Sequence, residues 1–159
     1  MKDLKHLYFL TKIDGLGTVR IKRLLDKFGS AEDVFNASLV DITEVENISS
    51  KTAISIIDSV KAHTEYENNF EELLSKAEKL DVKILSLTDD NYPDLLKRIY
   101  DPPLILYVRG KYDKNNLVNS IGIVGTRKPS DYCKKMSEKF ASELSSAGIS
   151  VLSGFGSGV

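Results

Sequence analysis

The sequence has very few of the residues that form covalent or metal cross-links. Among its 159 residues there are no tryptophans, one cysteine and two histidines. A lone Cys133 can form no internal disulfide, and His6 and His63 have no metal-ligand spacing to each other or to it. No Ser-His-Asp set and no catalytic pair of carboxylates can be made out either. We therefore expect no disulfide framework, no metal site and no catalytic residues.

Long hydrophobic runs are also missing. No apolar stretch approaches the roughly 20 residues that a membrane helix needs. Charged residues interrupt positions 1–17, where a signal peptide would have its apolar segment. The 42% of hydrophobic residues is enough for a packed core. These features predict a soluble, globular protein in the cytoplasm, with no membrane partner.

Neither sign of charge is in clear excess. The formal net charge is -1, which argues against a strongly basic nucleic-acid binder. The distribution is uneven, however, because residues 121–159 contain five Lys and Arg against three Asp and Glu, whereas the rest of the chain is slightly acidic. Exposed charges are screened beyond about 8 Å at physiological salt. A local positive patch can therefore still bind phosphate.

The first sixty residues predict a series of short helices. In TVRIKRLLDKFG, apolar residues recur at the i, i+3, i+4 and i+7 positions of one helical face: Ile21, Leu24, Leu25 and Phe28. Gly29 follows at the position of a C-terminal cap. Residues 51–80 are charged and have few helix breakers, so they predict one long helix or two in series.

The linker IDGLG, residues 13–17, has the pattern of a helix-hairpin-helix. Gly15 and Gly17 allow a tight turn and leave N-H groups at a helix N-terminus, where an anion such as a DNA phosphate is favoured. Arg20 follows on the polar face. The alternative is a plain turn between packed helices with a solvated basic face. A similar pattern recurs later in the chain, with residues 47–49 at the positions equivalent to residues 15–17. We interpret it as a degenerate repeat of the hairpin.

The second half alternates strands with helices. A helix with Ser130 as its N-cap lies between the last two predicted strands, and this strand, helix, strand order predicts a right-handed parallel crossover. The predicted strands are 82–87, 104–108, 120–124 and 149–154.

The predicted fold class is accordingly α/β. It comprises a helical domain of the helix-hairpin-helix or SAM-like type at 1–62 and a connecting helix at 63–80. The N-terminal part of a Rossmann-like parallel-sheet domain, which binds DNA in our interpretation, follows at 81–159.

The loop VGTRKPS after the third predicted strand carries the strongest functional signal. Ligands of open α/β sheets bind beyond the carboxyl ends of the strands, and the dipole of the following helix favours negative charge there. Arg127 can make a bidentate contact to a phosphate. The glycine-rich loop 153–158 leaves the neighbouring strand at the same edge. The candidate phosphodiester-binding residues are Gly125, Thr126, Arg127, Lys128, Ser130, Ser153, Gly154 and Gly156.

Simpler interpretations compete with some of these assignments. Arg127 can instead pair with an acidic side chain, and the glycines can serve only as turns. A group of aspartates suggests a metal site but is more typical of helix capping before a Tyr-Pro turn: Asp89, Asp90 and Asp94. Three tyrosines are expected in the core or at its rim, although a tyrosine can also stack on an unpaired base: Tyr92, Tyr100 and Tyr107.

Three separated motifs occur in an order and spacing that resemble one known family. They are NYPDLLKRIYDPPLILYVRG at 91–110, VGTR at 124–127 followed by Ser130 and Tyr132, and SGFGSG at 153–158. The chain resembles the DNA processing protein A family, called DprA or Smf, and the resemblance covers nearly all of it. It departs from the family at Cys133, where members commonly have glycine, and at 155–156, where they commonly have leucine and alanine.

The resemblance implies a non-enzymatic protein without a cofactor. It implies that single-stranded DNA is bound and protected during natural transformation, that the RecA recombinase is loaded, and that the full-length protein is a homodimer. It also assigns Arg127 and its loop to the DNA-binding pocket. The hairpin residues Gly15, Gly17 and Arg20 form a second candidate DNA contact. Because the sequence stops at Val159, inside the last motif, we interpret it as an N-terminal fragment and expect such a piece to be poorly stable or oligomeric.

Two other functions compete with this one. A Rossmann-like nucleotide-binding enzyme, such as a LOG-type phosphoribohydrolase, has a similar first phosphate loop but needs a downstream PGG-type motif with a catalytic glutamate. The N-terminal helical region and the Tyr-Pro and Asp-Pro-Pro segments favour DNA binding. The third alternative is an interaction module that acts only through the helical domain.

Overall fold

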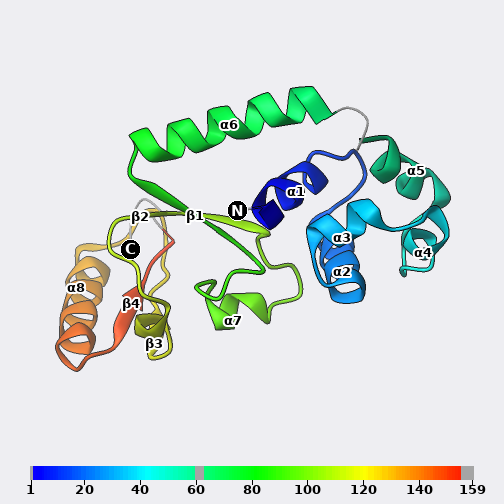
Figure 1. Cartoon of the computed structure of the whole chain (residues 1–159). Helices are drawn as coiled ribbons and strands as arrows, with labels where there is room; N and C mark the ends of the chain where they lie inside the picture. The colour runs from blue at the N-terminus through cyan, green and yellow to red at the C-terminus, as the bar shows by residue number, and fades with distance from the viewer. Residues whose placement is uncertain (1, 60–62, 155–159) are drawn as a thin grey trace. The chain divides into compact units, whose positions relative to one another are not determined.

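The computed structural model describes residues 2–59 and 63–154. Contacts divide the chain into two compact units, Met1–Tyr112 and Asp113–Val159 (Figure 1). The domain limits expected from the sequence, at residues 62 and 80, stay predictions. No helix in the described part of the chain is both long enough and apolar enough to cross a membrane.

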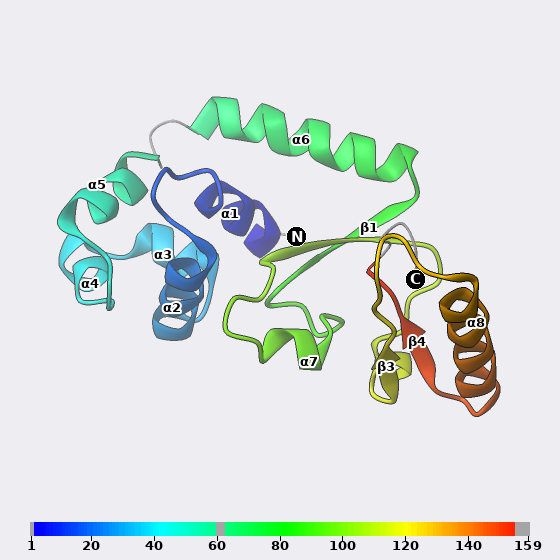
Figure 2. The same ribbon diagram turned by 180° about the vertical axis from the view of Figure 1, so that it is seen from behind.

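Within its described residues, the first unit begins with six helices, which confirms the predicted helical N-terminal region. The two helices in series that the sequence allowed at 51–80 are α5 and α6. Figure 2 shows α2 to α5 gathered beside α1. The bounds of the helices are α1 Lys2–Leu10, α2 Thr18–Phe28, α3 Ala31–Asn36, α4 Leu39–Thr43, α5 Ser50–Ser59 and α6 His63–Lys79.

The apolar face of α2 is the one that the sequence predicts. Ile21, Leu24 and Leu25 are buried, and the half-buried Phe28 packs against the same cluster. Gly29 ends the helix with a φ of +89°, and its N-H donates to the carbonyl oxygen of Leu25. A φ in this range strains any residue with a Cβ, which is why glycine stands there.

Two hydrophobic clusters hold the first unit together. The larger one joins the helical region to three residues from the segment between the first two strands, Leu87, Tyr92 and Leu104. The smaller one is aromatic, with Tyr8 and Phe9 of α1 packed against Phe70 of α6. Helix α6 therefore lies along α1, as Figures 1 and 2 both show.

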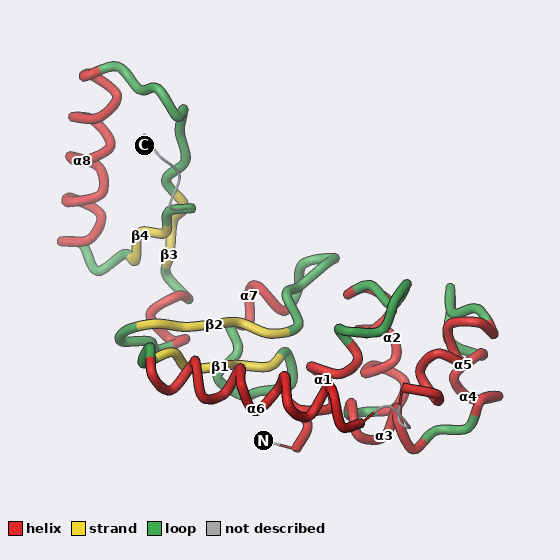
Figure 3. Tube along the Cα trace, turned by 90° about the horizontal axis from the view of Figure 1, so that it is seen from above, coloured by secondary structure: helices red, strands yellow, loops and turns green. Residues whose placement is uncertain are grey.

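The first two strands form a sheet of their own. Strand β1 (Val82–Ser86) pairs antiparallel with β2 (Ile105–Arg109), and the short α7 (Asp94–Lys97) lies in the connection between them (Figure 3). The expected parallel sheet thus does not include these strands among the described residues. The physical reason lies in the connection, because Tyr92 is buried and its hydroxyl donates to the carbonyl oxygen of Pro103 at 2.6 Å. This contact folds the chain back toward the helical core.

The second unit contains the expected parallel crossover. Strands β3 (Ser120–Gly122) and β4 (Ser150–Leu152) pair in parallel and are joined by α8 (Asp131–Ser146). A 3-10 turn, η1 (Lys114–Leu117), precedes β3. Ser130 caps α8, as predicted, by accepting a hydrogen bond from the N-H of Cys133 at 3.3 Å. The α/β fold class with a helical N-terminal region is confirmed.

Candidate nucleic-acid interface

The parallel register places the two predicted loops at one edge of the second unit. Gly122 pairs with Leu152, and the N-H of Ile123 donates to the carbonyl oxygen of Leu152 at 2.9 Å. The segments that follow therefore leave β3 and β4 side by side. This arrangement brings Gly125 and Thr126 to the same edge as Ser153 and Gly154, whereas the predicted Gly156 lies outside the described residues.

Local hydrogen bonds fix the loop after β3. The hydroxyl of Thr126 accepts a hydrogen bond from the N-H of Lys128 at 3.3 Å, and Ser130 is committed to capping α8. Arg127 and Lys128, between them, are exposed, and within residues 2–59 and 63–154 neither makes an ion pair. The loop thus presents two adjacent cations beside a helix N-terminus, where the backbone dipole also favours an anion.

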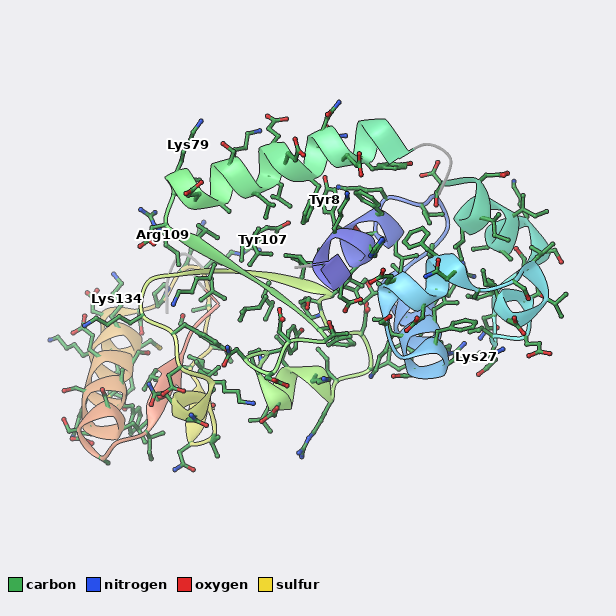
Figure 4. All side chains as sticks on the ribbon, viewed as in Figure 1. Tyr8, Lys27, Lys79, Tyr107, Arg109 and Lys134 are labelled. Atoms are coloured by element: carbon green, nitrogen blue, oxygen red, sulfur yellow. The ribbon has the colours of Figure 1, made fainter. Side chains whose placement is uncertain are left out.

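Lys134 is a basic residue of this edge that the sequence reasoning missed. It lines a cleft of about 350 Å³ together with Ile123 and Ser153. Figure 4 labels Lys134 on α8. Its Nζ lies 3.5 Å from a carboxylate oxygen of Asp131, and both side chains are largely exposed, so the pair is weak. Lys134 stands four residues after Ser130 and therefore on the same helical face, which is the signal that was available in the sequence.

Glu138 works against an anion in the same cleft. It lines the cleft with Lys134, one helical turn further along α8. The positive potential is therefore strongest toward the loop and the start of α8, and it decreases along the helix. A phosphate is best placed near Arg127 and Lys128 rather than deep in the cleft.

The opposite side of α8 is apolar and open. Met136, Phe140 and Leu144 line a groove of about 580 Å³ with residues of β3 and with Gly125 and Thr126 of the following loop. Phe140 is 52% exposed. These three side chains of α8 carry no charge that selects a phosphate, so we assign this face of the helix no part in anion binding.

The two hairpins of the first unit have the same backbone geometry. Gly15 has a φ of +78°, and Asn47, at the equivalent position, has a φ of +65°. In each hairpin the next residue donates to the carbonyl oxygen three residues before it: Leu16 to Ile13 and Ile48 to Val45, both at 3.1 Å. The degenerate repeat in the sequence is therefore a repeat in the structure.

One polar cleft of about 530 Å³ is lined by both hairpins. The first hairpin contributes Asp14, Gly15 and Arg20. The second contributes the start of α5 with one further cation, Lys51. Two of the three predicted hairpin residues thus line a common cleft, and the third, Gly17, lies at a neighbouring cleft with Asp101.

Much of the basic face of α2 is used to hold the hairpins together. Arg20 donates to the carbonyl oxygen of Gly15 at 2.5 Å. Lys27 pairs with Glu44 at 2.9 Å, and the ion pair from Arg23 to Glu46 is 3.4 Å long. A DNA phosphate at the hairpins therefore competes with existing partners.

One of the three aspartates near the Tyr-Pro turn, Asp89, has a structural role in the backbone hydrogen bonding of that turn. The carboxylate of Asp89 accepts a hydrogen bond from the N-H of Ser86 at 2.6 Å. No group of three or more metal-ligating side chains is close enough to hold an ion in the described part of the chain. The hydrogen bond of Asp89 is therefore typical of a turn.

The three tyrosines have different environments. Tyr92 is buried, and this burial, followed by the effect of Tyr112, raises the pKa of its phenol. Burial likewise raises the pKa of Tyr107, with a smaller contribution from Tyr8, although 56% of Tyr107 is exposed. Tyr100 is 79% exposed. Tyr92 is therefore a core residue, whereas the other two are exposed.

The sequence matches two family models that together cover most of the chain. The model of DNA recombination-mediator protein A matches residues 83–159, and that of the SAM-like helix-hairpin-helix tandem matches residues 8–62. Protein Smf of Synechocystis sp. is 29% identical over 164 residues, which is 100% of this chain and 40% of that protein. The chain belongs to the DprA/Smf family.

Two other DprA/Smf relatives have a higher identity over a shorter stretch. Protein Smf of Borreliella burgdorferi is 38% identical over 76 residues, or 48% of this chain and 24% of that protein. DNA processing protein DprA of Bacillus subtilis is 35% identical over 78 residues, or 49% of this chain and 26% of that protein. The chain thus spans two fifths or less of the length of these relatives. No solved structure matches it.

Proposed function

We propose that this chain acts in DNA processing during recombination and natural transformation by binding single-stranded DNA at the β3–β4 edge. The observation that carries the proposal is the pair Arg127 and Lys128, which stand exposed and without ion pairs in the described structure, between Thr126 and the cap residue Ser130. The name of the Bacillus subtilis relative, a DNA processing protein, supports the same role.

Binding on this account is dominated by phosphate contacts. The guanidinium of Arg127 binds two oxygens of one phosphate, and Lys128 and the first N-H groups of α8 supply further positive potential. Lys134 adds a cation one turn along the helix. Phosphate contacts carry no sequence information, so the affinity should be salt-dependent and nearly independent of base sequence.

The loop after β4 has a different part in the proposed site. Ser153 lines the cleft beside α8, and no atom lies within 4 Å of the position that a Cβ would take on Gly154. A backbone without side chains allows a phosphodiester to approach the N-H groups closely. We assign Ser153 and Gly154 to backbone contacts, and we extend that proposal to Gly156 from the sequence motif.

The hairpins are proposed as a weaker, secondary DNA contact. The shared cleft with Gly15, Arg20 and Lys51 supports it. The ion pairs of Arg23 and Lys27 within the unit limit it, because those two cations are already neutralised. We therefore expect the hairpins to contribute less to affinity than the loop after β3.

Several finer proposals rest on the family resemblance. They are that the protein works in the cytoplasm as a non-enzymatic binding protein without a cofactor, forms homodimers at full length, shields single strands from nucleases, and loads RecA. The proposal that the protein loads RecA is tested by measuring the growth of RecA filaments on single-stranded DNA that is already coated with protein. We expect faster growth when the full-length protein is present. An unchanged rate would exclude it.

A direct test uses fluorescence anisotropy of a labelled single-stranded oligonucleotide. We expect Arg127→Ala to weaken binding about tenfold, the lower range for a charge-assisted hydrogen bond. Arg98→Ala is the matched control, since Arg98 is exposed and makes no ion pair in the described part of the chain. Unlabelled duplex should compete poorly. Displacement of the oligonucleotide by low concentrations of AMP would instead favour a nucleotide-binding enzyme, and equal affinities of the two variants would refute the loop assignment.

A further inference from the structure

The end of the β1–β2 sheet carries an aromatic ring and a guanidinium on one face. Val82 pairs with Arg109, and Ile84 pairs with Tyr107. Because side chains of a strand alternate between its two faces, Tyr107 and Arg109 project from the same face, two residues apart. Both are exposed, and 56% of the tyrosine is accessible.

Two lysines lie near this end of the sheet. Lys79 ends α6, three residues before the start of β1, and Lys111 follows β2. Figure 4 shows Lys79 and Arg109 at the end where α6 leads into β1. We call Lys79, Tyr107, Arg109 and Lys111 the strand-end patch.

The charge of this patch is not neutralised internally. Within residues 2–59 and 63–154, none of its three cations makes an ion pair or a side-chain hydrogen bond. Two exposed acidic residues, Glu78 and Asp81, lie in the same stretch of sequence. Three cations against two carboxylates leave a net positive charge in a part of the chain that is acidic as a whole.

Tyr107 is only partly explained by packing. Its phenol is close enough to Tyr8 for that residue to affect its pKa, so one end of the ring belongs to the rim of the aromatic cluster. More than half of Tyr107 remains exposed, on the same face of the strand as Arg109. An exposed ring flanked by unpaired cations is the combination that binds single-stranded nucleic acids, in which the ring stacks on a base and the cations bind the phosphates.

We propose that the strand-end patch is a second contact for single-stranded nucleic acid, in which Tyr107 stacks on an unpaired base and Arg109 and Lys79 bind flanking phosphates. The inference rests on the proposed function and adds a site to it on the other unit. A duplex does not expose its base faces to such a ring, and an acidic peptide satisfies the cations but gives the ring no stacking partner. The combination of ring and cations therefore favours a single strand over both.

The test compares two labelled oligonucleotides of equal length, oligo-dT and an abasic chain with the same phosphates. We expect Tyr107→Leu to weaken oligo-dT binding at least about fivefold, in line with the stacking contribution of one base, and to leave abasic binding unchanged. The double variant Lys79→Gln/Arg109→Gln should weaken binding to both oligonucleotides and lower the salt slope by about 1.4, or about 0.7 per phosphate. Arg98→Gln controls for loss of an exposed charge outside the patch.

Control variants keep the result interpretable. Tyr107→Phe keeps the ring and should bind like the unmodified chain, and each variant is compared by thermal melting because Tyr107 borders the aromatic cluster. If Tyr107→Leu melts at a lower temperature than the unmodified chain, the test rests on Arg109→Gln alone, because the Arg109 side chain is exposed. Equal effects of the patch variants and Arg98→Gln would overturn the inference, as would equal losses on oligo-dT and abasic DNA for Tyr107→Leu.

The outcome also separates this inference from the proposed function. If Arg127→Ala weakens binding and the patch variants do not, the loop site stands and the patch is refuted. If the patch variants weaken binding and Arg127→Ala does not, the patch stands and the loop assignment fails. If acidic peptide displaces oligo-dT as well as single-stranded DNA does, the patch is a protein-docking surface and the inference is refuted.

Discussion

Asn47 adopts the same left-handed backbone region in the second hairpin that Gly15 adopts in the first, at φ values of +65° and +78°. This region strains residues with a Cβ, and asparagine tolerates it better than most. The relationship explains why the second hairpin lacks the glycines of the first and still has its hydrogen bonds. The backbone strain at these two positions can therefore be measured by substitution.

Gly15→Ala should destabilise the chain by about 1 kcal/mol, the lower range for a Cβ in a left-handed conformation. No atom lies within 4 Å of the added Cβ, so the cost comes from backbone strain alone. Gly17→Ala is the matched control because Gly17 has a φ of -76° and equally open surroundings. Urea unfolding measures both. Similar destabilisation by the two variants would contradict the strain argument.

Asn47→Gly should leave the stability unchanged or raise it by a few tenths of a kcal/mol. Glycine relieves the strain at a φ of +65° but increases the conformational entropy of the unfolded chain, so the two effects partly cancel. The same urea titration measures the change. A loss of more than about 1 kcal/mol would show that the Asn47 side chain supports the hairpin through its own contacts.

Ser130→Ala should fray the start of α8 and cost about 1 kcal/mol, because the hydroxyl accepts a hydrogen bond from the N-H of Cys133. Faster hydrogen exchange at residues 131–133 is the expected signature. Ser137→Ala is the control, since that hydroxyl only donates to the carbonyl oxygen of Cys133 within the helix. Unchanged exchange in Ser130→Ala would mean that the cap does not order the loop end.

Stability should fall as the pH rises above about 10, partly because of Tyr92. Burial raises the pKa of this phenol above its ordinary value of 10.0, so the unfolded chain loses the proton first. The contribution is fully present below pH 10 and is lost as the pH rises toward the higher folded value. Urea unfolding at pH 8 and pH 11 measures it. Tyr92→Phe should lose about 1 kcal/mol at pH 8 and show a smaller decrease at pH 11; an equal decrease would assign the effect to other groups.

Lys51→Gln tests the secondary hairpin contact. Lys51 lines the cleft shared by both hairpins, so its removal should weaken binding of single-stranded DNA about twofold and lower the salt slope by less than Arg127→Ala does. Lys97→Gln, another exposed lysine, serves as control. Equal affinities of the two variants would leave the hairpins with a structural role only.

The helices and their ends could be predicted because their signals are local. The apolar spacing from Ile21 to Phe28, Gly29 after α2 and Ser130 before α8 each act within a few residues of their own position. The parallel β3–α8–β4 crossover followed from the same kind of reasoning. Local propensity and periodicity agree with the structure in these segments.

The pairing of β1 with β2 could not be predicted in the same way. It depends on Tyr92 and Leu104, which join a core made mostly by helices far away in the sequence. In the candidate site, the sequence alone showed that Arg127 and Lys128 follow the end of a strand. That Lys134 and Asp101 line clefts could be seen only in the folded structure. Contacts between distant segments decide these features, and a sequence pattern does not contain them.

The most direct test of the central claim is the salt dependence of single-strand binding, measured for the unmodified chain, Arg127→Ala and Arg98→Ala over the same salt series. If Arg127 binds a phosphate, its removal should lower the slope of log K against log salt by about 0.7, and removal of Arg98 should leave the slope unchanged. Identical slopes for all three proteins would contradict the assignment of Arg127 to the DNA-binding site.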